Sequence, residues 1–275
     1  MSQEKQRLDI RLTEEGYYPS REKARAAIMA GLVFIKGEKA EKPGLMIKPE
    51  TVIEVRGNPI QYVSRGGLKL EKAVQVFNLS LDGRVVLDVG ASTGGFTDCA
   101  LRCGARKVYA VDVGYGQLAW QLRTDPRVVV LERKNIRFLT KEALAEPPDF
   151  ITVDVSFISL SKVLPRVGEL TTPAAEGVAL VKPQFEAGRD KVGKKGVIRE
   201  PAIHIEVLRN IEALVTGLGW SVKGLDYSPV TGPEGNIEYL IFFQKNGIHT
   251  VCNISEVVER AHEQLIIKKQ KQPTP

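Results

Sequence analysis

Two lysines and two acidic residues of this chain stand next to predicted strands. Lys69 precedes the first strongly apolar run. Asp154 and Lys182 end two later runs, and Glu238 opens the last one. Lysine is protonated at pH 7, so its amine takes a proton from a poor nucleophile only where burial or a second cation favours the neutral form. Lys69 can be that cation for Lys182, and the carboxylates can orient both amines. The set therefore predicts a catalytic constellation, although each residue alone is also typical of a solvated sheet edge.

A glycine-rich segment predicts a ligand site. The run Val85-Val-Leu-Asp-Val-Gly-Ala-Ser-Thr-Gly-Gly-Phe-Thr97 has the pattern of a strand, a loop and a helix start. Its glycine spacing differs from the dinucleotide fingerprint, and Asp88 would repel a pyrophosphate but suits a ligand with an ammonium group. S-adenosylmethionine has that group and no phosphate. Asp112, after the next strand, can accept hydrogen bonds from ribose hydroxyls, and Asn135 is placed to contact adenine; each acidic residue could also be a cap or turn residue. The predicted cofactor-binding residues are Asp88, Gly90, Ser92, Gly94, Gly95, Phe96, Asp112 and Asn135.

Alternating strand and helix patterns must position these residues. Strands are expected at 84–88, 107–112, 128–131, 150–154, 177–182, 221–227 and 237–244, with helices at 67–77, 95–103, 117–122, 160–170 and 203–218. The alternation predicts an α/β fold with a mostly parallel sheet. No helix separates the last two strands, so the last strand should run antiparallel, as in the Rossmann-like seven-stranded S-adenosylmethionine-dependent methyltransferase fold. The start of that strand, with Glu238, then meets the carboxyl ends of the others, where ligands bind.

Residues 1–58 predict a separate small α+β domain, followed by a linker over 59–64. Helical patterns begin near Arg7 and at Arg21, and short strands follow at 32–35 and 52–55. Ser20 is placed to cap the second helix. Basic side chains cluster at the start of that helix, where free N–H groups already favour anions. This predicts a phosphate-binding surface, with an ordinary solvated helix face as the alternative.

The motif in this segment supports the first interpretation. Arg7-Leu-Asp-x-x-Leu12, then Ser20-Arg-x-x-Ala24 through Gly37, then Lys42-Pro-Gly44, closely resembles the alpha-L RNA-binding module first seen in a small-subunit ribosomal protein. The resemblance covers nearly all of 1–58 and implies docking on structured RNA through shape and phosphate contacts. The RNA-binding residues it implies are Arg7, Ser20, Arg21, Lys23, Arg25 and Lys36.

The order Lys69, Asp154, Lys182, Glu238 resembles the tetrad of ribose 2′-O-methyltransferases. With Arg65-Gly-Gly-Leu-Lys69 and Lys182-Pro-Gln-Phe-Glu186, the whole chain resembles the TlyA family of ribosomal RNA 2′-O-methyltransferases, often labelled hemolysins. The resemblance implies an FtsJ-like methyltransferase domain over 65–268, S-adenosylmethionine as cofactor, no metal, and ribosomal RNA or ribosomal subunits rather than DNA as partner. Methyl transfer from a sulfonium is an in-line displacement that needs an aligned hydroxyl and a nearby base. An RNA-binding protein with an inactive methyltransferase fold is the alternative.

Further basic residues lie in the loop after Lys182 and ahead of Lys69. A mobile phosphate-contacting flap and a solvated surface loop explain the loop equally well. The RNA-binding interpretation adds Arg65, Arg189, Lys191, Lys194 and Lys195.

Composition limits the class of protein. The 275 residues carry a net charge of +6 and are 43% hydrophobic, which allows a packed core and excludes a disordered chain. No apolar run reaches membrane-spanning length and no signal peptide is visible, so we expect a cytoplasmic protein and find no support for a membrane-active hemolysin. Three cysteines are too few for a disulfide framework, and Cys99 and Cys103 are better explained as core residues than as metal ligands. The tail, 269–275, is expected to be disordered.

Overall fold

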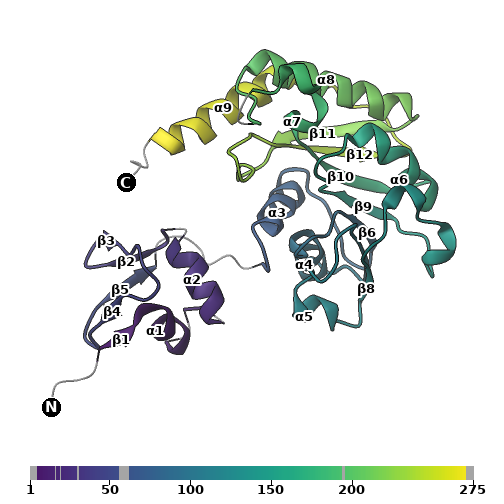
Figure 1. The fold of residues 1–275 in the computed structure, drawn as a ribbon. Helices are drawn as coiled ribbons and strands as arrows, with labels where there is room; N and C mark the ends of the chain where they lie inside the picture. The colour runs from purple at the N-terminus through teal and green to yellow at the C-terminus, as the bar shows by residue number, and fades with distance from the viewer. Residues whose placement is uncertain are drawn as a thin grey trace. The chain divides into compact units, whose positions relative to one another are not determined.

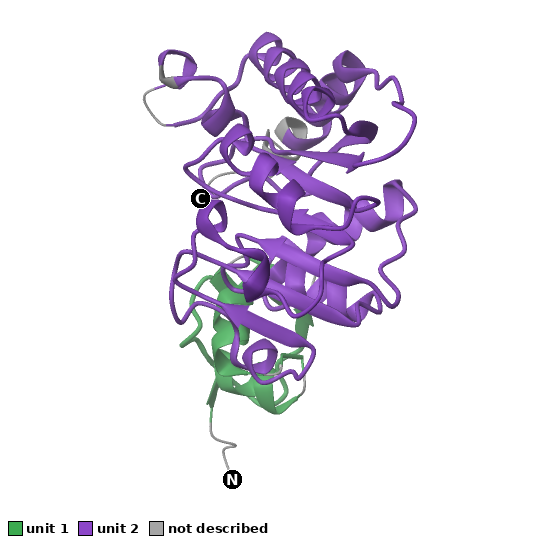
Figure 2. Ribbon diagram, turned by 90° about the vertical axis from the view of Figure 1, so that its right-hand side faces the viewer, with its two compact units in different colours: residues 1–61 green, residues 62–275 purple. Residues whose placement is uncertain are grey.

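The computed structural model describes residues 5–15, 17–18, 20–29, 31–55, 62–193 and 196–270. The chain divides into two compact units, residues 1–61 and 62–275 (Figure 2). Within the described residues, no helix is long and apolar enough to cross a membrane.

The first unit combines two helices with short strands. Helices α1 (Leu8–Glu14) and α2 (Arg21–Met29) pack on a core with the antiparallel sheet β3 (Glu38–Lys39), β2 (Val33–Ile35) and β5 (Ile53–Val55). Strands β1 (Gln6–Arg7) and β4 (Met46–Ile47) form a second, two-stranded sheet. The strands β1, β3 and β4 were not predicted, because two residues are too few to show an alternating pattern.

The second unit contains one seven-stranded sheet (Figure 1). Its order is β11 (Ser221–Tyr227), β12 (Tyr239–Gln244), β10 (Glu176–Val181), β9 (Phe150–Val153), β6 (Val85–Val89), β7 (Lys107–Val111) and β8 (Val128–Leu131). Strand β12 runs antiparallel to both neighbours, and the other pairs are parallel. All seven strands lie at the predicted places, and the predicted fold class is confirmed.

Helices cover both faces of this sheet. Alternate residues Val85, Leu87 and Val89 of β6 join a core with α6 (Leu164–Leu170), α8 (Pro201–Gly217) and α9 (Ile254–Gln270). The side chain of Asp88 points to the other face, where it contacts α4 (Gly95–Arg102). Helix α3 (Gly66–Val76) packs on α4, and the short helices α5 (Trp120–Arg123) and α7 (Pro183–Glu186) follow β7 and β10.

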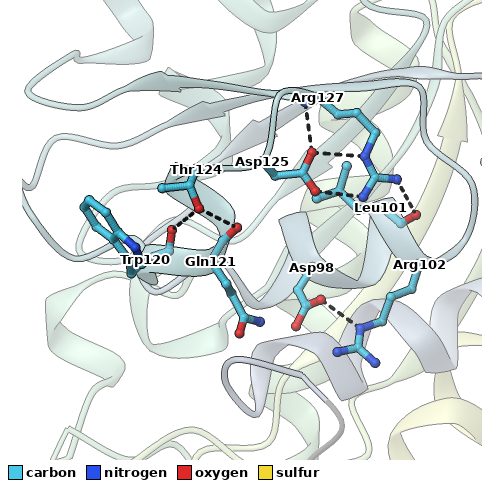
Figure 3. Close-up of polar contacts among 8 residues, drawn as sticks. All are labelled: Asp98, Leu101, Arg102, Trp120, Gln121, Thr124, Asp125 and Arg127. Atoms are coloured by element: carbon cyan, nitrogen blue, oxygen red, sulfur yellow. Dashed lines mark hydrogen bonds and ion pairs between the residues drawn. The ribbon is translucent and has the colours of Figure 1, made fainter.

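Polar contacts around α4 fix the helix that follows the glycine loop (Figure 3). Asp98 accepts hydrogen bonds from Arg102 at 2.8 Å and from the Val63 backbone N–H at 2.8 Å. In the same view, Arg127 forms an ion pair with Asp125 at 2.7 Å and donates a hydrogen bond to the backbone oxygen of Leu101 in α4 at 3.5 Å. Helix α4 is therefore tied to the segment that leads into α3.

Helix α9 corrects the prediction for the tail. It was not among the predicted helices, and it includes residues 269 and 270, which were expected to be disordered. Its side chains Ile254, Val258 and Ala261 are buried in the sheet's core. The charged composition of the segment hides this apolar stripe. Residues 271–275 lie outside the described residues.

Candidate active site

The predicted ligand loop borders a cavity of about 430 Å³ at the carboxyl edge of the sheet. Four of the predicted cofactor residues line it: Gly90, Ser92, Asp112 and Asn135. The walls also include apolar side chains, among them Val113, Ile136, Ile158 and Val163. Carboxylate, amide and apolar surfaces therefore converge on one cavity, as a nucleoside ligand requires.

Glycine is required at two positions of this loop, because each has a positive φ and no room for a Cβ atom. Gly90 has φ of +86°, and a Cβ there would lie 2.5 Å from the backbone oxygen of Asp154. Gly94 has φ of +97°, and a Cβ there would lie 2.3 Å from Leu122. A larger residue at Gly90 would therefore displace both the loop and the end of β9.

Asp112 holds the loop from the side of β7. Its two carboxylate oxygens accept hydrogen bonds from the backbone N–H groups of Ser92 at 2.8 Å and Gly114 at 2.7 Å. Asn135 is both a cavity residue and a cap, because its side-chain oxygen accepts from the Arg137 backbone N–H at 3.1 Å. The capping role of Asn135 is thus compatible with its position in the cavity.

The structure places the other four predicted cofactor residues differently. Gly95 and Phe96 line a second cavity described below, and Gly94 lines neither cavity. The prediction that Asp88 faces the ammonium group is corrected: its side chain is 0% exposed and accepts hydrogen bonds from Thr97 at 2.6 Å and Thr152 at 2.9 Å. These two hydroxyls come from α4 and β9, so Asp88 supports the loop from beneath.

Burial of Asp88 makes stability depend on pH. Desolvation raises the pKa of Asp88 to about 6, from an ordinary value of 3.8, although the two threonines oppose the shift. The folded protein thus binds the Asp88 proton more tightly than the unfolded chain does. The charged carboxylate therefore destabilises the fold above pH 6, and this destabilisation decreases as the pH falls below 6 and Asp88 becomes protonated. Asp88→Asn has no such charge. We expect the free energy of unfolding of the natural protein, relative to Asp88→Asn, to rise by about 2 kcal/mol from pH 7.5 to 4.5 in urea titrations. A difference between the two proteins that is constant with pH would contradict this.

The four predicted catalytic residues form a continuous chain of ion pairs. Lys182 Nζ lies 2.6 Å from Asp154 Oδ1, and Lys69 Nζ lies 3.5 Å from Asp154 Oδ2. The Lys69 amine also lies 2.7 Å from Glu238 Oε2. Asp154 therefore bridges the two lysines, and Glu238 holds only Lys69.

Lys69 is the fixed cation among these four ion-paired residues. Burial opposes its charge, but the Asp154 and Glu238 carboxylates more than offset burial and raise the pKa of Lys69. Its side chain is 12% exposed and that of Lys182 is 9% exposed. Helix α3 supplies Lys69, the ends of β9 and β10 supply Asp154 and Lys182, and the residue before β12 supplies Glu238.

A second cavity, of about 310 Å³, contains all four of these residues. It shares Gly90, Ser92, Asp154 and Ser156 with the first cavity. A ligand in the first cavity can thus present a group to a second molecule beside Lys182.

Two polar residues near the chain of ion pairs were not among the predicted site residues, although Glu186 belongs to the Lys182–Glu186 motif. Ser156 accepts a hydrogen bond from Lys182 Nζ at 2.9 Å. Glu186 accepts from Ser159 Oγ at 2.7 Å and from the Leu160 N–H at 2.8 Å. Burial raises the pKa of Glu186, with these bonds opposing the shift. The position of Ser156 two residues after Asp154 is the one signal that could have indicated it.

The predicted RNA-binding residues are placed unevenly. Arg7 and Arg21 both bind Asp9, at 2.9 Å each, and Asp9 is 0% exposed. These bonds lower the pKa of Asp9 to about 2, against the effect of burial. Both arginines thus also hold the first unit together.

The remaining predicted RNA contacts are distributed over both units. Ser20 accepts a hydrogen bond from the Lys23 N–H at 3.3 Å, as a cap should, and Arg25 and Lys36 are exposed. In the second unit Arg65 is exposed at the second cavity, whereas Lys191 is paired with Glu206. Lys194, Lys195 and the side chain of Arg189 lie outside the described residues.

No cluster of three or more His, Cys, Asp or Glu residues that could hold a metal ion occurs in the described part of the chain. Of the predicted core cysteines, Cys99 is buried and Cys103 is half-buried.

Comparisons with known proteins agree with this architecture. Residues 62–245 match the family described as FtsJ-like methyltransferase, and residues 6–53 match the S4 domain. The chain is 49% identical to "Putative rRNA methyltransferase YqxC" of Bacillus subtilis, over 98% of each chain. It is 44% identical to "16S/23S rRNA (cytidine-2'-O)-methyltransferase TlyA" of Mycobacterium tuberculosis, over 93% of this chain and 96% of that one. The solved structure titled "Putative hemolysin from Streptococcus thermophilus" is 45% identical, with a TM-score of 0.77 and coverage of 98% and 99%.

The fold and the site define an S-adenosylmethionine-dependent methyltransferase with an N-terminal S4 domain. The chain belongs to the TlyA family. Its first cavity fits the cofactor: Asp112 has the chemistry to bind ribose hydroxyls, Asn135 an adenine edge, and the apolar walls a purine ring. When bound, S-adenosylmethionine supplies an electrophilic methyl group.

Proposed function

We propose that this protein methylates a ribose 2′-hydroxyl of ribosomal RNA. The observation that carries the proposal is the Lys182–Asp154–Lys69–Glu238 chain at the junction of two cavities. The Mycobacterium tuberculosis relative is named for this reaction on 16S and 23S rRNA, and its 44% identity supports the same reaction here.

In this proposal Lys182 is the proton acceptor. The ribose oxygen forms its bond to the methyl carbon while its O–H bond breaks, and the proton passes to the neutral Lys182 amine. The electron pair of the broken carbon–sulfur bond stays with sulfur. Asp154 then stabilises the ammonium that has formed on Lys182, at 2.6 Å.

Lys69 and Glu238 act on this step through Asp154. Lys69 stays cationic, because two carboxylates hold it, and it shares the Asp154 carboxylate with Lys182. This sharing divides the negative charge of Asp154 between the two amines. Glu238 keeps Lys69 charged and in place.

The test is transfer of a tritiated methyl group from S-adenosylmethionine to free 16S rRNA, free 23S rRNA and each ribosomal subunit, followed by mapping of the labelled ribose. We expect label on a 2′-oxygen in at least one of the four substrates. Label on a base, or no label on any RNA although the cofactor binds, would overturn the proposal. The second outcome is the one expected of an RNA-binding protein with an inactive fold.

The first unit is proposed to bind RNA through the half-buried Lys23 and the exposed Arg25 and Lys36. Replacing Lys23, Arg25 and Lys36 together with alanine should weaken rRNA binding about tenfold or more and reduce its salt dependence, because phosphate contacts release counterions. Filter binding at several salt concentrations measures both quantities. Lys48→Ala, on an exposed lysine of the same unit paired with Glu50, is the matched control. Equal salt dependence in the triple variant and the natural protein would contradict the assignment.

A further inference from the structure

The Lys182 amine has a second fixed partner besides Asp154. Asp154 Oδ1 lies 2.6 Å from Nζ, and Ser156 Oγ accepts a hydrogen bond from it at 2.9 Å. The two partners are separated by one residue at the end of β9, and Lys182 itself is 7% exposed. The amine is therefore held between two acceptors in a confined space.

The number of hydrogen-bonding and ion-pair partners around the Lys182 amine matters, because this amine is the proposed proton acceptor. A neutral lysine amine has two N–H bonds and one lone pair. The hydrogen bond to Ser156 fixes the direction of one N–H, and the ion pair with Asp154 Oδ1 holds the nitrogen from a second side, which restricts the direction of the lone pair. Ser156 and Lys182 both line the second cavity. Asp154 and Ser156 therefore restrict the direction of the lone pair at the place where a substrate hydroxyl would enter.

The segment that carries Ser156 is fastened to α7, the helix that begins directly after Lys182. Glu186, at the end of α7, binds Ser159 and the Leu160 N–H. The rings of Phe157 and Phe185 lie 5.0 Å apart between centroids. Phe157 has φ of +62°, a value that non-glycine residues rarely adopt, so this turn needs outside support to persist.

Residues 154–160 and 182–186 thus contact each other at three successive places. Lys182 binds Asp154 and Ser156, Phe185 packs on Phe157, and Glu186 binds Ser159 and Leu160. The contacts fix the distance between the Ser156 hydroxyl and the Lys182 amine from both ends of α7.

We infer that Ser156 is a positioning residue that directs the Lys182 amine toward the substrate hydroxyl, and that Glu186 keeps the Ser156 turn in place. The inference rests on the proposed function, because it assigns Ser156 a role only through Lys182.

The experiment measures single-turnover methyl transfer with saturating cofactor and rRNA. Ser156→Ala should lower the rate at least tenfold even at saturating cofactor and RNA, and should move the pH at half-maximal rate. Ser156→Thr retains the hydroxyl and should recover the rate to within about threefold of the natural protein. Glu186→Gln should lower the rate less than Ser156→Ala and add nothing to it in the double variant. Ser80→Ala, on an exposed serine outside both cavities, is the control.

A double-variant comparison separates positioning from general damage. Ser156→Ala should slow the natural protein but not the Lys182→Ala protein, because its effect passes through that amine. Equal slowing in both backgrounds, a threonine variant as slow as the alanine variant, or a natural rate in Ser156→Ala would each overturn the inference. Lys182→Ala with a natural rate would instead overturn the proposed function, so the two failures are distinguishable.

Discussion

Lys182→Ala is expected to lower single-turnover methyl transfer by about 10²–10⁴-fold, the range that a general base contributes. The reason is geometric: the Lys182 amine is the proton acceptor proposed here, and Asp154 and Ser156 hold it at the second cavity. Cofactor binding should stay within about threefold of the natural protein, because Lys182 does not line the first cavity. Tritiated methyl transfer and calorimetric titration of S-adenosylmethionine measure the two quantities separately.

The control for this variant is Lys223→Ala, on a half-buried lysine of the edge strand β11. It removes a lysine of the same unit without touching either cavity. A Lys182→Ala protein that transfers methyl at the natural rate would remove Lys182 from the reaction. One that loses cofactor binding would show that Lys182 supports the first cavity instead.

Asp112→Ala is expected to weaken cofactor binding and to leave the methyl-transfer rate nearly unchanged, the reverse of Lys182→Ala. It removes a carboxylate from the first cavity. It also leaves the backbone N–H groups of Ser92 and Gly114 without the acceptor to which they donate hydrogen bonds. Two hydrogen bonds from ribose hydroxyls to a charged group contribute about 3 kcal/mol, so the dissociation constant for S-adenosylmethionine should rise about 100-fold. At saturating cofactor the transfer rate should fall less than about fivefold, since the Lys182–Asp154 contact is unaffected.

Asp112→Asn retains one acceptor and should weaken binding by an intermediate amount. Asp125→Ala provides the control, because Asp125 pairs with Arg127 away from both cavities (Figure 3). Unchanged affinity in Asp112→Ala would mean that the cofactor ribose lies elsewhere. A loss of transfer that saturation does not restore would mean that the Asp112 loop also shapes the second cavity.

Several features of the fold were predictable because they follow from local patterns. The seven strands were found from apolar runs of strand length, and the antiparallel course of β12 from the missing helix before it. Helix α9 was missed because only tertiary packing against α8 and β11 reveals that Val258 and Ala261 form its buried side. The two-residue strands of the first unit were missed because two residues are too few to show an alternating pattern, whether the partner is distant, as for β1 and β4, or adjacent in sequence, as for β3 and β2.

The sequence by itself determined which residue types were available at the ends of the strands. Once the strand order was predicted, it also placed Lys69, Asp154, Lys182 and Glu238 at one edge of the sheet. It could not determine which amine binds which carboxylate, because side chains from four elements compete for the same space.

Tertiary structure decided those pairings. In the folded protein Asp154 forms ion pairs with both lysines, and Glu238 forms one with Lys69. It turned Asp88 away from the ligand, because alternate residues of a strand face opposite sides and the α4 side offered two threonine hydroxyls. It also brought Ser156 to Lys182 through a turn whose conformation depends on contacts with α7.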